Sequence, residues 1–454
     1  MNNQLVNSLQ QPLSLRFWQL ALPLILSNVS IALLGLVDTA VAGHLPGAYY
    51  LGGVAIGGTV FNFLYWGFNF LRMGTSGLAA QAVGRGDAVA VRATLAQGLL
   101  VAGMCTLLLL VLQQPIIDLA MRLILPGQAV TEQARAYFSV RIWATPAALA
   151  NFVILGWFIG LQKGRAALYL LLMVNTVNTL LDLWFVVGLG WGVEGVAAAS
   201  VVGEFTGSLL ALAMVRSILR RYPGKWGLRA LVDRESLSKL FHTHRHLFVR
   251  TMALLGVFVF VNAQSARLGD TALAATAIVM NFYLLASFAL DGLANAAEAL
   301  TGEAVGAGNQ PYLQRVVMLV LGWGTVVAVL FSIVYALAGH QLYTLMTDLP
   351  AVRTLLAELL PWAVLLPIVS VYGFLFDGIF TGATWTREMR NTVLVSTLLV
   401  FLPAWYLTQP LGINGLWLAF VLFNLSRGVT LGWILWRRLR VPGWLKTANG
   451  LPRR

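Results

Sequence analysis

Uninterrupted apolar runs of about 20 residues recur along the whole chain, and only short polar segments separate them. In α-helical form, about 20 apolar residues cross the hydrocarbon core of a bilayer. Only 10% of the residues are charged, whereas a soluble domain carries roughly a quarter. The ten-residue alternation typical of a transmembrane barrel does not occur in the sequence. The sequence therefore predicts an all-α integral membrane protein and excludes a soluble fold.

Twelve transmembrane helices are expected, each delimited to within a few residues. The spans are 16–42, 50–72, 92–112, 133–160, 167–188, 193–215, 246–268, 272–299, 314–338, 354–381, 391–408 and 413–436. An even number of spans places both termini on the same side of the membrane.

The distribution of basic residues indicates which side that is. Lys and Arg number 30 against 17 Asp and Glu, which gives a formal net charge of +13. With cytoplasmic termini, 24 of the 30 fall in cytoplasmic connections and tails, in agreement with the positive-inside bias. Because this bias accounts for the basic excess, no nucleic-acid partner is expected. We expect a multi-pass protein of the cell (inner or plasma) membrane, embedded in the lipid bilayer with both termini cytoplasmic.

Short motifs recur at an offset of 222 residues on either side of a charged connection. QAVGRGD at 81–87 corresponds to EAVGAGN at 303–309, and GWFIG at 156–160 corresponds to GIFTG at 378–382. Because six spans separate equivalent points, the copies have the same orientation and are related by a pseudo-two-fold axis along the membrane normal, with a substrate path between them. The expected domains are an N-terminal six-helix lobe, a cytoplasmic linker, a C-terminal six-helix lobe and a cytoplasmic tail, at 1–215, 216–245, 246–440 and 441–454.

The fifth span carries a polar stripe in an otherwise apolar segment. Its members are Asn175, Asn178, Thr179 and Asp182. They stand at i, i+3, i+4 and i+7, so they share one helix face. A carboxyl group at this depth either stays protonated or ionises when water or a cation arrives, and an amide one turn away can bind both forms. A purely structural network worth on the order of 1 kcal/mol per contact is the alternative. Because intramembrane acids are functional by default, we interpret Asp182 as a cation-binding or proton-binding group that Asn175 and Asn178 orient.

A second intramembrane carboxyl group is available in the same half of the chain. Asp38 lies in the first span, and Pro23 lies 15 residues before it. A proline inside a helix removes a backbone hydrogen bond, so a protonation-dependent hinge and a static kink are both open interpretations. The other first-half candidates, as residues that line or support a substrate cavity, are Thr179, Ser200, Glu204, Tyr137 and Asn151.

The second half contains a different set of polar residues. Its first span has Asn262 but no acid, and Asp291 and Asp377 lie in its second and fourth spans. These three are the second-lobe candidates. Glu298 and Glu303 lie near a helix end, where we expect them to be solvated.

Motifs that would indicate an enzyme are missing or lack their partners. No GxxxxGK[ST] phosphate loop occurs, so direct use of ATP is not expected. GTSG at 74–77 has no intramembrane histidine to activate its serine, and HTHRH at 242–246 lies in the basic linker without an acid or cysteine partner. We expect no enzyme activity, no metal centre and no cofactor, and an ion gradient as the source of energy.

The motifs together resemble the multidrug and toxic compound extrusion family, and within it the DinF-like branch. LLGLVDTAVAGHL, GTSGLAAQAVGRGD and MVNTVNTLLD carry the resemblance, which covers nearly the whole chain. It implies two six-helix lobes, alternating access, and cation-driven export of varied organic compounds that are often cationic or amphipathic. It also implies a coupling site on Asp38, Asn178 and Asp182, with Pro23 upstream. We expect small-molecule organic substrates and a functional monomer.

The coupling ion and the transported class have alternatives. The NorM-like branch of the same family uses an acid in the seventh helix for sodium, and this chain has none there. A proton (H+) is therefore the expected coupling ion, and a sodium ion (Na+) bound by the same N-lobe carboxylates stays open. A lipid or glycolipid flippase of the related superfamily is a second alternative. A receptor or scaffold without transport is a third, and it would need no coupled carboxylates.

Overall fold

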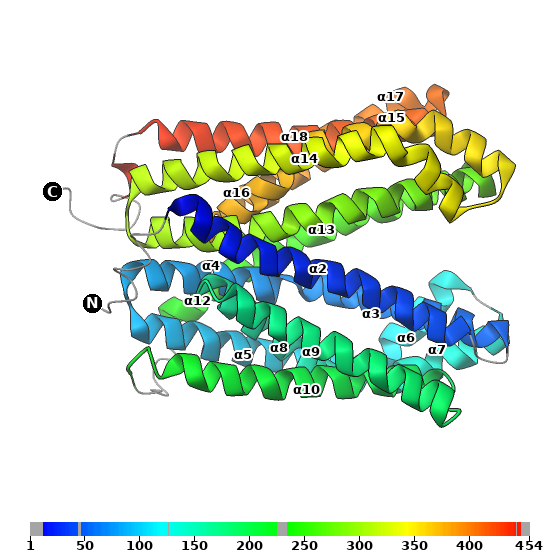
Figure 1. Cartoon of the computed structure of the whole chain (residues 1–454), viewed down its shortest axis with the longest axis horizontal. Helices are drawn as coiled ribbons and strands as arrows, with labels where there is room; N and C mark the ends of the chain where they lie inside the picture. Colours follow the sequence, from blue (N-terminus) through cyan, green and yellow to red (C-terminus); the bar gives the residue numbers. More distant parts are fainter. Residues whose placement is uncertain (1–11, 44–46, 126, 225–233, 442, 446–454) are drawn as a thin grey trace. The chain divides into compact units, whose positions relative to one another are not determined.

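The structure is a computed structural model in which residues 12–43, 47–125, 127–224, 234–441 and 443–445 are described. Every regular element in these ranges is helical (Figure 1), which confirms the expected all-α fold. The α-helices are α2 (Leu13–Gly43), α3 (Ala48–Phe68), α4 (Phe70–Arg85), α5 (Ala88–Val111), α6 (Gln113–Ile124), α7 (Gln128–Arg141), α8 (Thr145–Gly160), α9 (Gly164–Asp182), α10 (Val193–Leu219), α12 (Arg234–Arg267), α13 (Asp270–Gly306), α14 (Gln310–Met346), α15 (Pro350–Gly382), α16 (Thr386–Val395), α17 (Leu402–Thr408) and α18 (Ile413–Leu439). The π-helical segments Leu183–Gly188 and Ser396–Phe401 follow α9 and α16.

Eleven helical segments in the described part of the chain are long and apolar enough to cross a membrane. With α2, a helix of 31 residues, they occupy the positions of the twelve expected spans. The second span is longer than expected, because α3 and α4 together form the segment Tyr49–Arg85. The QAVGRGD motif therefore forms the end of a helix and the turn that follows it.

Two compact units make up the chain. Unit 1 contains the residues up to Ile25 and those from His242 onward, and unit 2 runs from Leu26 to Phe241. The division at residue 242 lies inside the expected linker at 216–245, whereas the other division lies within α2. A Cβ added at Gly292 of α13 would lie 2.4 Å from the Ile25 side chain, so the first turns of α2 pack closely on α13 in unit 1.

Glycines bring helices into close contact at equivalent places in the two units. In unit 2, a Cβ added at Gly156 of α8 would lie 2.2 Å from the carbonyl oxygen of Arg72 in α4. In unit 1, a Cβ added at Gly378 of α15 would lie 2.2 Å from the carbonyl oxygen of Ala294 in α13. Both members of the second contact lie 222 residues after their counterparts, so the repeated motifs correspond to a repeated mode of helix packing.

The turns after α4 and α13 are also equivalent. Gly86 and Gly308 have positive φ angles of 69° and 64°, a conformation that glycine adopts without strain. The next residues, Asp87 and Asn309, cap the following helices, since each side chain accepts a hydrogen bond from the backbone N–H three residues later, at 2.9 and 3.0 Å. A tight turn with the same chemistry therefore starts the following long helix in each unit.

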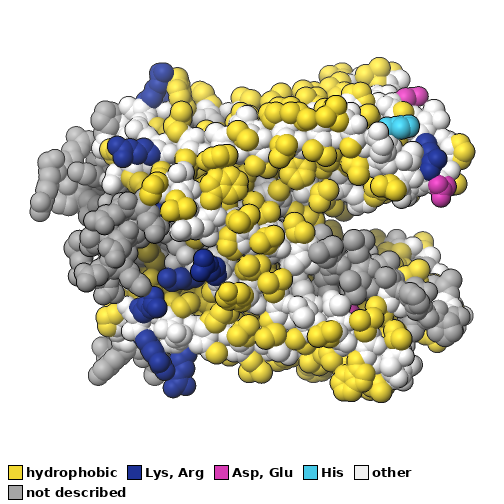
Figure 2. Space-filling model, viewed as in Figure 1, with side chains coloured by type: hydrophobic (Ala, Val, Ile, Leu, Met, Phe, Trp, Pro, Cys, Tyr) yellow, Lys and Arg dark blue, Asp and Glu magenta, His cyan; other side chains and the backbone are white. Residues whose placement is uncertain are grey.

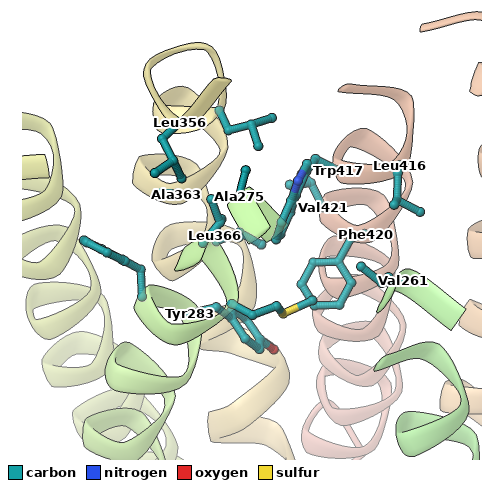
Figure 3. Packing of buried hydrophobic residues seen from close by; sticks show 14 of the residues in the cluster. Val261, Ala275, Tyr283, Leu356, Ala363, Leu366, Leu416, Trp417, Phe420 and Val421 are labelled. Atoms are coloured by element: carbon teal, nitrogen blue, oxygen red, sulfur yellow. The ribbon is translucent and has the colours of Figure 1, made fainter. Parts of the chain in front are cut away.

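Each unit has its own aromatic core. In unit 1, side chains from α12, α13, α15 and α18 converge (Figure 3), and the rings of Tyr283 and Phe420 meet edge to face at 5.3 Å, with Trp417 beside Phe420. In unit 2, Phe61 of α3 stacks on Phe138 of α7 at 5.0 Å. Burying aromatic rings in this way fixes the helices that carry the polar groups described below.

Large apolar side chains also cover the outside of the helices. Figure 2 shows hydrophobic side chains along the helices and most of the visible Lys and Arg side chains toward their ends. Leu209 of α10 and Leu337 of α14, for example, are 69% and 76% exposed. Exposed apolar surface of this extent is typical of helices that face lipid.

Candidate functional site

The predicted polar stripe lies on the buried face of α9 in unit 2. Asn175, Asn178 and Asp182 are 9%, 1% and 0% exposed, and Thr179 is half-buried. Asp182 is the last α-helical residue of α9, directly before the π-helical segment. Such π segments are frequent at functional sites because they change the direction of neighbouring side chains. Asn175, Asn178 and Asp182 therefore lie on one buried face of α9, as their spacing predicted.

Helix α10 lies close to the stripe because it presents a glycine there. A Cβ added at Gly203 would lie 2.9 Å from the carbonyl oxygen of Val174 and 3.2 Å from the Asn178 side chain. One turn from this glycine, Ser200 accepts a hydrogen bond from Asn178 Nδ2 at 2.9 Å. Ser200, expected only as a supporting residue, is thus a direct partner of the stripe.

The stripe also contacts α2 within unit 2. Asn175 Nδ2 donates to Ser30 Oγ at 2.9 Å, and Ser30 Oγ donates to the carbonyl oxygen of Ser27 at 2.7 Å. Ser30 was not among the predicted residues, because a serine in an apolar helix gives no signal of its own. The amide of Asn175 therefore connects α9 to the helix that contains Asp38 and Pro23.

Asp38 and Pro23 both lie in α2. Asp38 belongs to α2, but its side chain lies outside the described residues. Pro23 lies inside α2, in the part that belongs to unit 1. The hinge and the static kink stay open as interpretations of this proline.

Arg141 at the end of α7 adds a cation to this site. Its guanidinium group donates to Ser200 Oγ, which also accepts from Asn178 Nδ2. The same group lies over the rings of Phe61 and Tyr137, 5.6 and 5.7 Å from their centroids. Cation–π contacts of this kind stabilise a partly desolvated charge. Tyr137, which was expected to line or support a substrate cavity, is buried, and its ring therefore stabilises the charge of Arg141.

A second polar cluster lies one turn farther along α10. Asn151 Nδ2 of α8 donates to Glu204 Oε2 at 2.8 Å, and Ser208 Oγ donates to Asn151 Oδ1 at 2.8 Å. The charge of Arg141 also acts on Glu204. The predicted residues Asn151 and Glu204 are therefore direct partners, and Arg141 links their cluster electrostatically to the stripe.

Unit 1 contains a buried ion-pair cluster. Asp377 Oδ2 of α15 accepts from Arg427 Nη2 of α18 at 2.6 Å and from Arg250 Nη2 of α12. Arg427 also approaches Asn424 Oδ1 at 3.4 Å, and Tyr283 donates to the same oxygen at 3.2 Å. Arg250 and Asp377 are 127 positions apart, so no local spacing indicates that they pair. The position of Arg250 within the bounds of the seventh expected span, 246–268, indicates only that its charge needs a partner.

The other two second-lobe candidates differ from Asp377. Asp291 of α13 is half-buried, and its charge acts on Tyr283 together with that of Asp377. Asn262 of α12 is exposed and donates to the carbonyl oxygen of Phe258 in its own helix at 2.9 Å. Asn262 therefore does not join the cluster of Asp377.

The expectation of solvated glutamates at the end of α13 is wrong. Glu298 and Glu303 are buried, because the end of α13 packs closely against the glycines of α15. Glu303 Oε2 accepts from Arg16 Nη2 of α2 at 2.8 Å and from the Tyr312 hydroxyl at 3.0 Å, all within unit 1. The burial of the Glu303 charge is thus compensated by an ion pair and a hydrogen bond.

Two of the three histidines of the HTHRH motif are buried. They lie in α12, and His244 and His246 are each 3% exposed. His246 Nδ1 lies 3.0 Å from Arg390 Nη1, so its neighbour is a cation. Among the described residues, no group of three or more His, Cys, Asp or Glu side chains is arranged to hold a metal ion.

Comparisons with known proteins agree with this architecture. The family model described as MatE matches residues 23–184 and 247–406, one segment in each half. The chain is 42% identical to DNA damage-inducible protein F of Escherichia coli (strain K12) over 93% of this chain and 91% of that protein. It is 28% identical to the probable multidrug resistance protein NorM of Rhizobium meliloti (strain 1021), over 93% and 92%.

Solved structures share the fold. A structure described as MATE in complex with MaD3S superposes with a TM-score of 0.84 at 20% identity, covering 96% of this chain and 97% of that chain. A multidrug resistance MATE family transporter of the MOP superfamily in an outward-facing conformation gives a TM-score of 0.86 at 20% identity, covering 94% and 97%. The twelve-helix arrangement is therefore that of these transporters.

Proposed function

Because this chain belongs to the MatE family, we propose that it exports small organic compounds in exchange for protons. Members of the family are transporters and not enzymes, and the chain is a multi-pass membrane protein. The proposed substrates are varied organic compounds, often cationic or amphipathic. The name of the NorM relative, a probable multidrug resistance protein, supports this class.

The difference between the two units supports a coupling site in unit 2. Asp182 is a fully buried carboxyl group on a face that also carries two asparagines, one of them bonded to Ser200. Asp377 in unit 1 pairs directly with two guanidinium groups, so their positive charges repel any further cation, whereas the guanidinium group of Arg141 in unit 2 bonds to Ser200. The burial of Asp182 in the predicted stripe is the observation that carries the proposal.

The hydrogen bonds of the stripe suggest how proton binding moves helices. A change of charge at Asp182 alters which hydrogen bonds Asn178 and Asn175 make most favourably. Asn175 bonds to Ser30 of α2, and Asn178 bonds to Ser200 of α10, so both neighbouring helices respond to the same event. In this proposal Asp38 binds the proton together with Asp182, and Pro23 provides the hinge of α2.

Efflux from proteoliposomes tests the function and the coupling ion together. Ethidium-loaded vesicles containing the protein are given either a proton gradient or a sodium gradient. We expect efflux with the proton gradient and its loss in Asp182→Asn. Asp118→Asn, which changes a half-buried acid of α6 that pairs with Arg135 in the same unit, should keep full efflux. Efflux driven only by the sodium gradient would indicate that Na+, and not a proton, binds to the same carboxylates. Full proton-driven efflux by Asp182→Asn would show that the site is misassigned.

The proposed setting is the cell inner membrane, with both termini cytoplasmic and the monomer as the functional form. Labelling of an introduced C-terminal cysteine by a membrane-impermeant reagent, in intact and in opened cells, tests the orientation. Labelling only after the cells are opened is the expected result.

A further inference from the structure

The outer face of α10 changes from apolar to basic along a single stripe. Its members are Val202, Phe205, Leu209, Leu212, Arg216 and Arg220, all of them exposed. Their spacings of three and four residues place them on one side of the helix. The stripe is apolar over the membrane-spanning part and ends in two arginines, which is the order of acyl chain and headgroup in a phospholipid.

An open pocket of about 340 Å³ lies at the basic end of this stripe. Three arginines and three aliphatic residues line it, namely Arg92, Arg216, Arg220, Leu212, Val215 and Leu219. Arg92 belongs to α5, Arg220 directly follows the last residue of α10, and the other four belong to α10, all within unit 2. The pocket thus presents positive charge and apolar surface together, at the level where α10 leaves the apolar zone.

Arg92 gives the pocket a fixed cation. Its Nε donates to the carbonyl oxygen of Tyr222 at 2.6 Å, and its Nη2 donates to the carbonyl oxygen of Leu219 at 2.7 Å. Leu219 is the last residue of α10 and Tyr222 lies in the turn after it, so Arg92 binds at the C-terminal end of a helix, where cations are favoured by the helix dipole. The side chain of Arg92 is therefore held in place before any ligand binds.

The described carboxylates do not neutralise the pocket. None of the ion pairs found among the described residues involves Arg216 or Arg220, which stand four residues apart and repel each other. Arg221, the residue after Arg220, adds a further positive charge next to the pocket residues. Figure 2 shows Lys and Arg side chains gathered at the end of the molecule where α10 finishes.

We propose that this pocket binds the phosphate headgroup of an anionic phospholipid, with an acyl chain along the apolar stripe of α10. Clusters of Lys and Arg at the end of a transmembrane helix recognise anionic headgroups, and each cation contributes a similar increment. A free phosphate ion would use the arginines alone, whereas a phospholipid also covers Leu209 and Leu212. The exposed apolar stripe therefore favours the lipid over the free ion.

Native mass spectrometry of the detergent-solubilised protein, titrated with phosphatidylglycerol or phosphatidylcholine, tests the proposal. The wild type should retain phosphatidylglycerol in preference to phosphatidylcholine. Arg216→Gln/Arg220→Gln should bind phosphatidylglycerol about 25-fold more weakly, since each arginine contributes about 5-fold. Arg216→Lys/Arg220→Lys should retain the preference, because the charge is kept.

The matched control is Arg122→Gln/Arg267→Gln, which removes two exposed arginines outside the pocket and should bind as the wild type does. Equal loss in this control would mean that total charge, and not the pocket, binds the lipid. Unchanged binding in Arg216→Gln/Arg220→Gln would overturn the proposal. Full competition by inorganic phosphate at millimolar concentration would identify a free-anion site and would also overturn it.

Discussion

Replacing Gly378 with alanine should loosen the contact between α13 and α15 and destabilise unit 1. The added Cβ would lie 2.2 Å from the carbonyl oxygen of Ala294, whereas carbon–oxygen contacts settle at roughly 3.3 Å or more. The helices must therefore separate by about 1 Å. Because the neighbour is a backbone atom that cannot rotate away, we expect a cost near the upper end of overpacking, about 3 kcal/mol.

The intrinsic preference of alanine for helices offsets part of this cost. Alanine is favoured over glycine by about 1 kcal/mol in a helix interior, which leaves a net loss of about 2 kcal/mol for Gly378→Ala. Gly322 of α14 is the matched control, because it is exposed and no heavy atom would lie within 4 Å of an added Cβ. Gly322→Ala should therefore be neutral or stabilising by up to about 1 kcal/mol.

Thermal unfolding of the purified protein, followed by tryptophan fluorescence, measures both variants under one condition. Gly378→Ala should unfold at a lower temperature than the wild type, and Gly322→Ala should not. The equivalent substitution Gly156→Ala should behave as Gly378→Ala does, since its Cβ would also lie 2.2 Å from a backbone oxygen. If Gly378→Ala unfolded at or above the temperature of Gly322→Ala, the close helix contact would not be a determinant of stability.

Three further predictions concern charged and capping groups. Arg427→Ala should destabilise unit 1 by about 1.5–3 kcal/mol, because it removes one charged hydrogen-bond partner of the buried Asp377 while Arg250 remains, and thermal unfolding should show no such loss for the exposed Arg267→Ala. Asp87→Ala and Asn309→Ala should each cost about 1 kcal/mol, since each removes the N-cap of a long helix; an effect on neither would contradict the assigned caps. Lys163 lies outside the spans, and burial, and secondarily the charge of Arg221, lowers its pKa. Arg221→Gln should therefore raise the pKa of Lys163 partway and move the acylation of its amine to higher pH. A shift of the acylation to lower pH would contradict this.

The features that the sequence could predict are those visible within one helix or in the comparison of two segments. Runs of about 20 apolar residues gave the spans, and the motif offset of 222 residues gave the repeat that the glycine contacts reproduce. The i, i+3, i+4, i+7 spacing gave a single polar face on α9, and the structure buries that face. These predictions need only the geometry of one helix or the comparison of two segments.

The features that escaped prediction depend on packing between distant segments. Arg250 and Asp377 meet across 127 positions, and Arg16 and Glu303 meet across 287, so neither pair has a sequence pattern. Glu303 was expected in water because it stands near a helix end, but that end is covered by other parts of unit 1. The division of the chain within α2 has the same origin, since it depends on which neighbours the first turns contact.

Proton release on substrate binding tests the central claim, that Asp182 exchanges a proton during transport. Ethidium is added to the purified protein in weakly buffered solution, and the change of pH and the amount of bound dye are measured for the wild type, Asp182→Asn and Asp118→Asn. We expect proton release by the wild type and by Asp118→Asn, and dye binding without that release by Asp182→Asn. Equal proton release by Asp182→Asn and the wild type would contradict it.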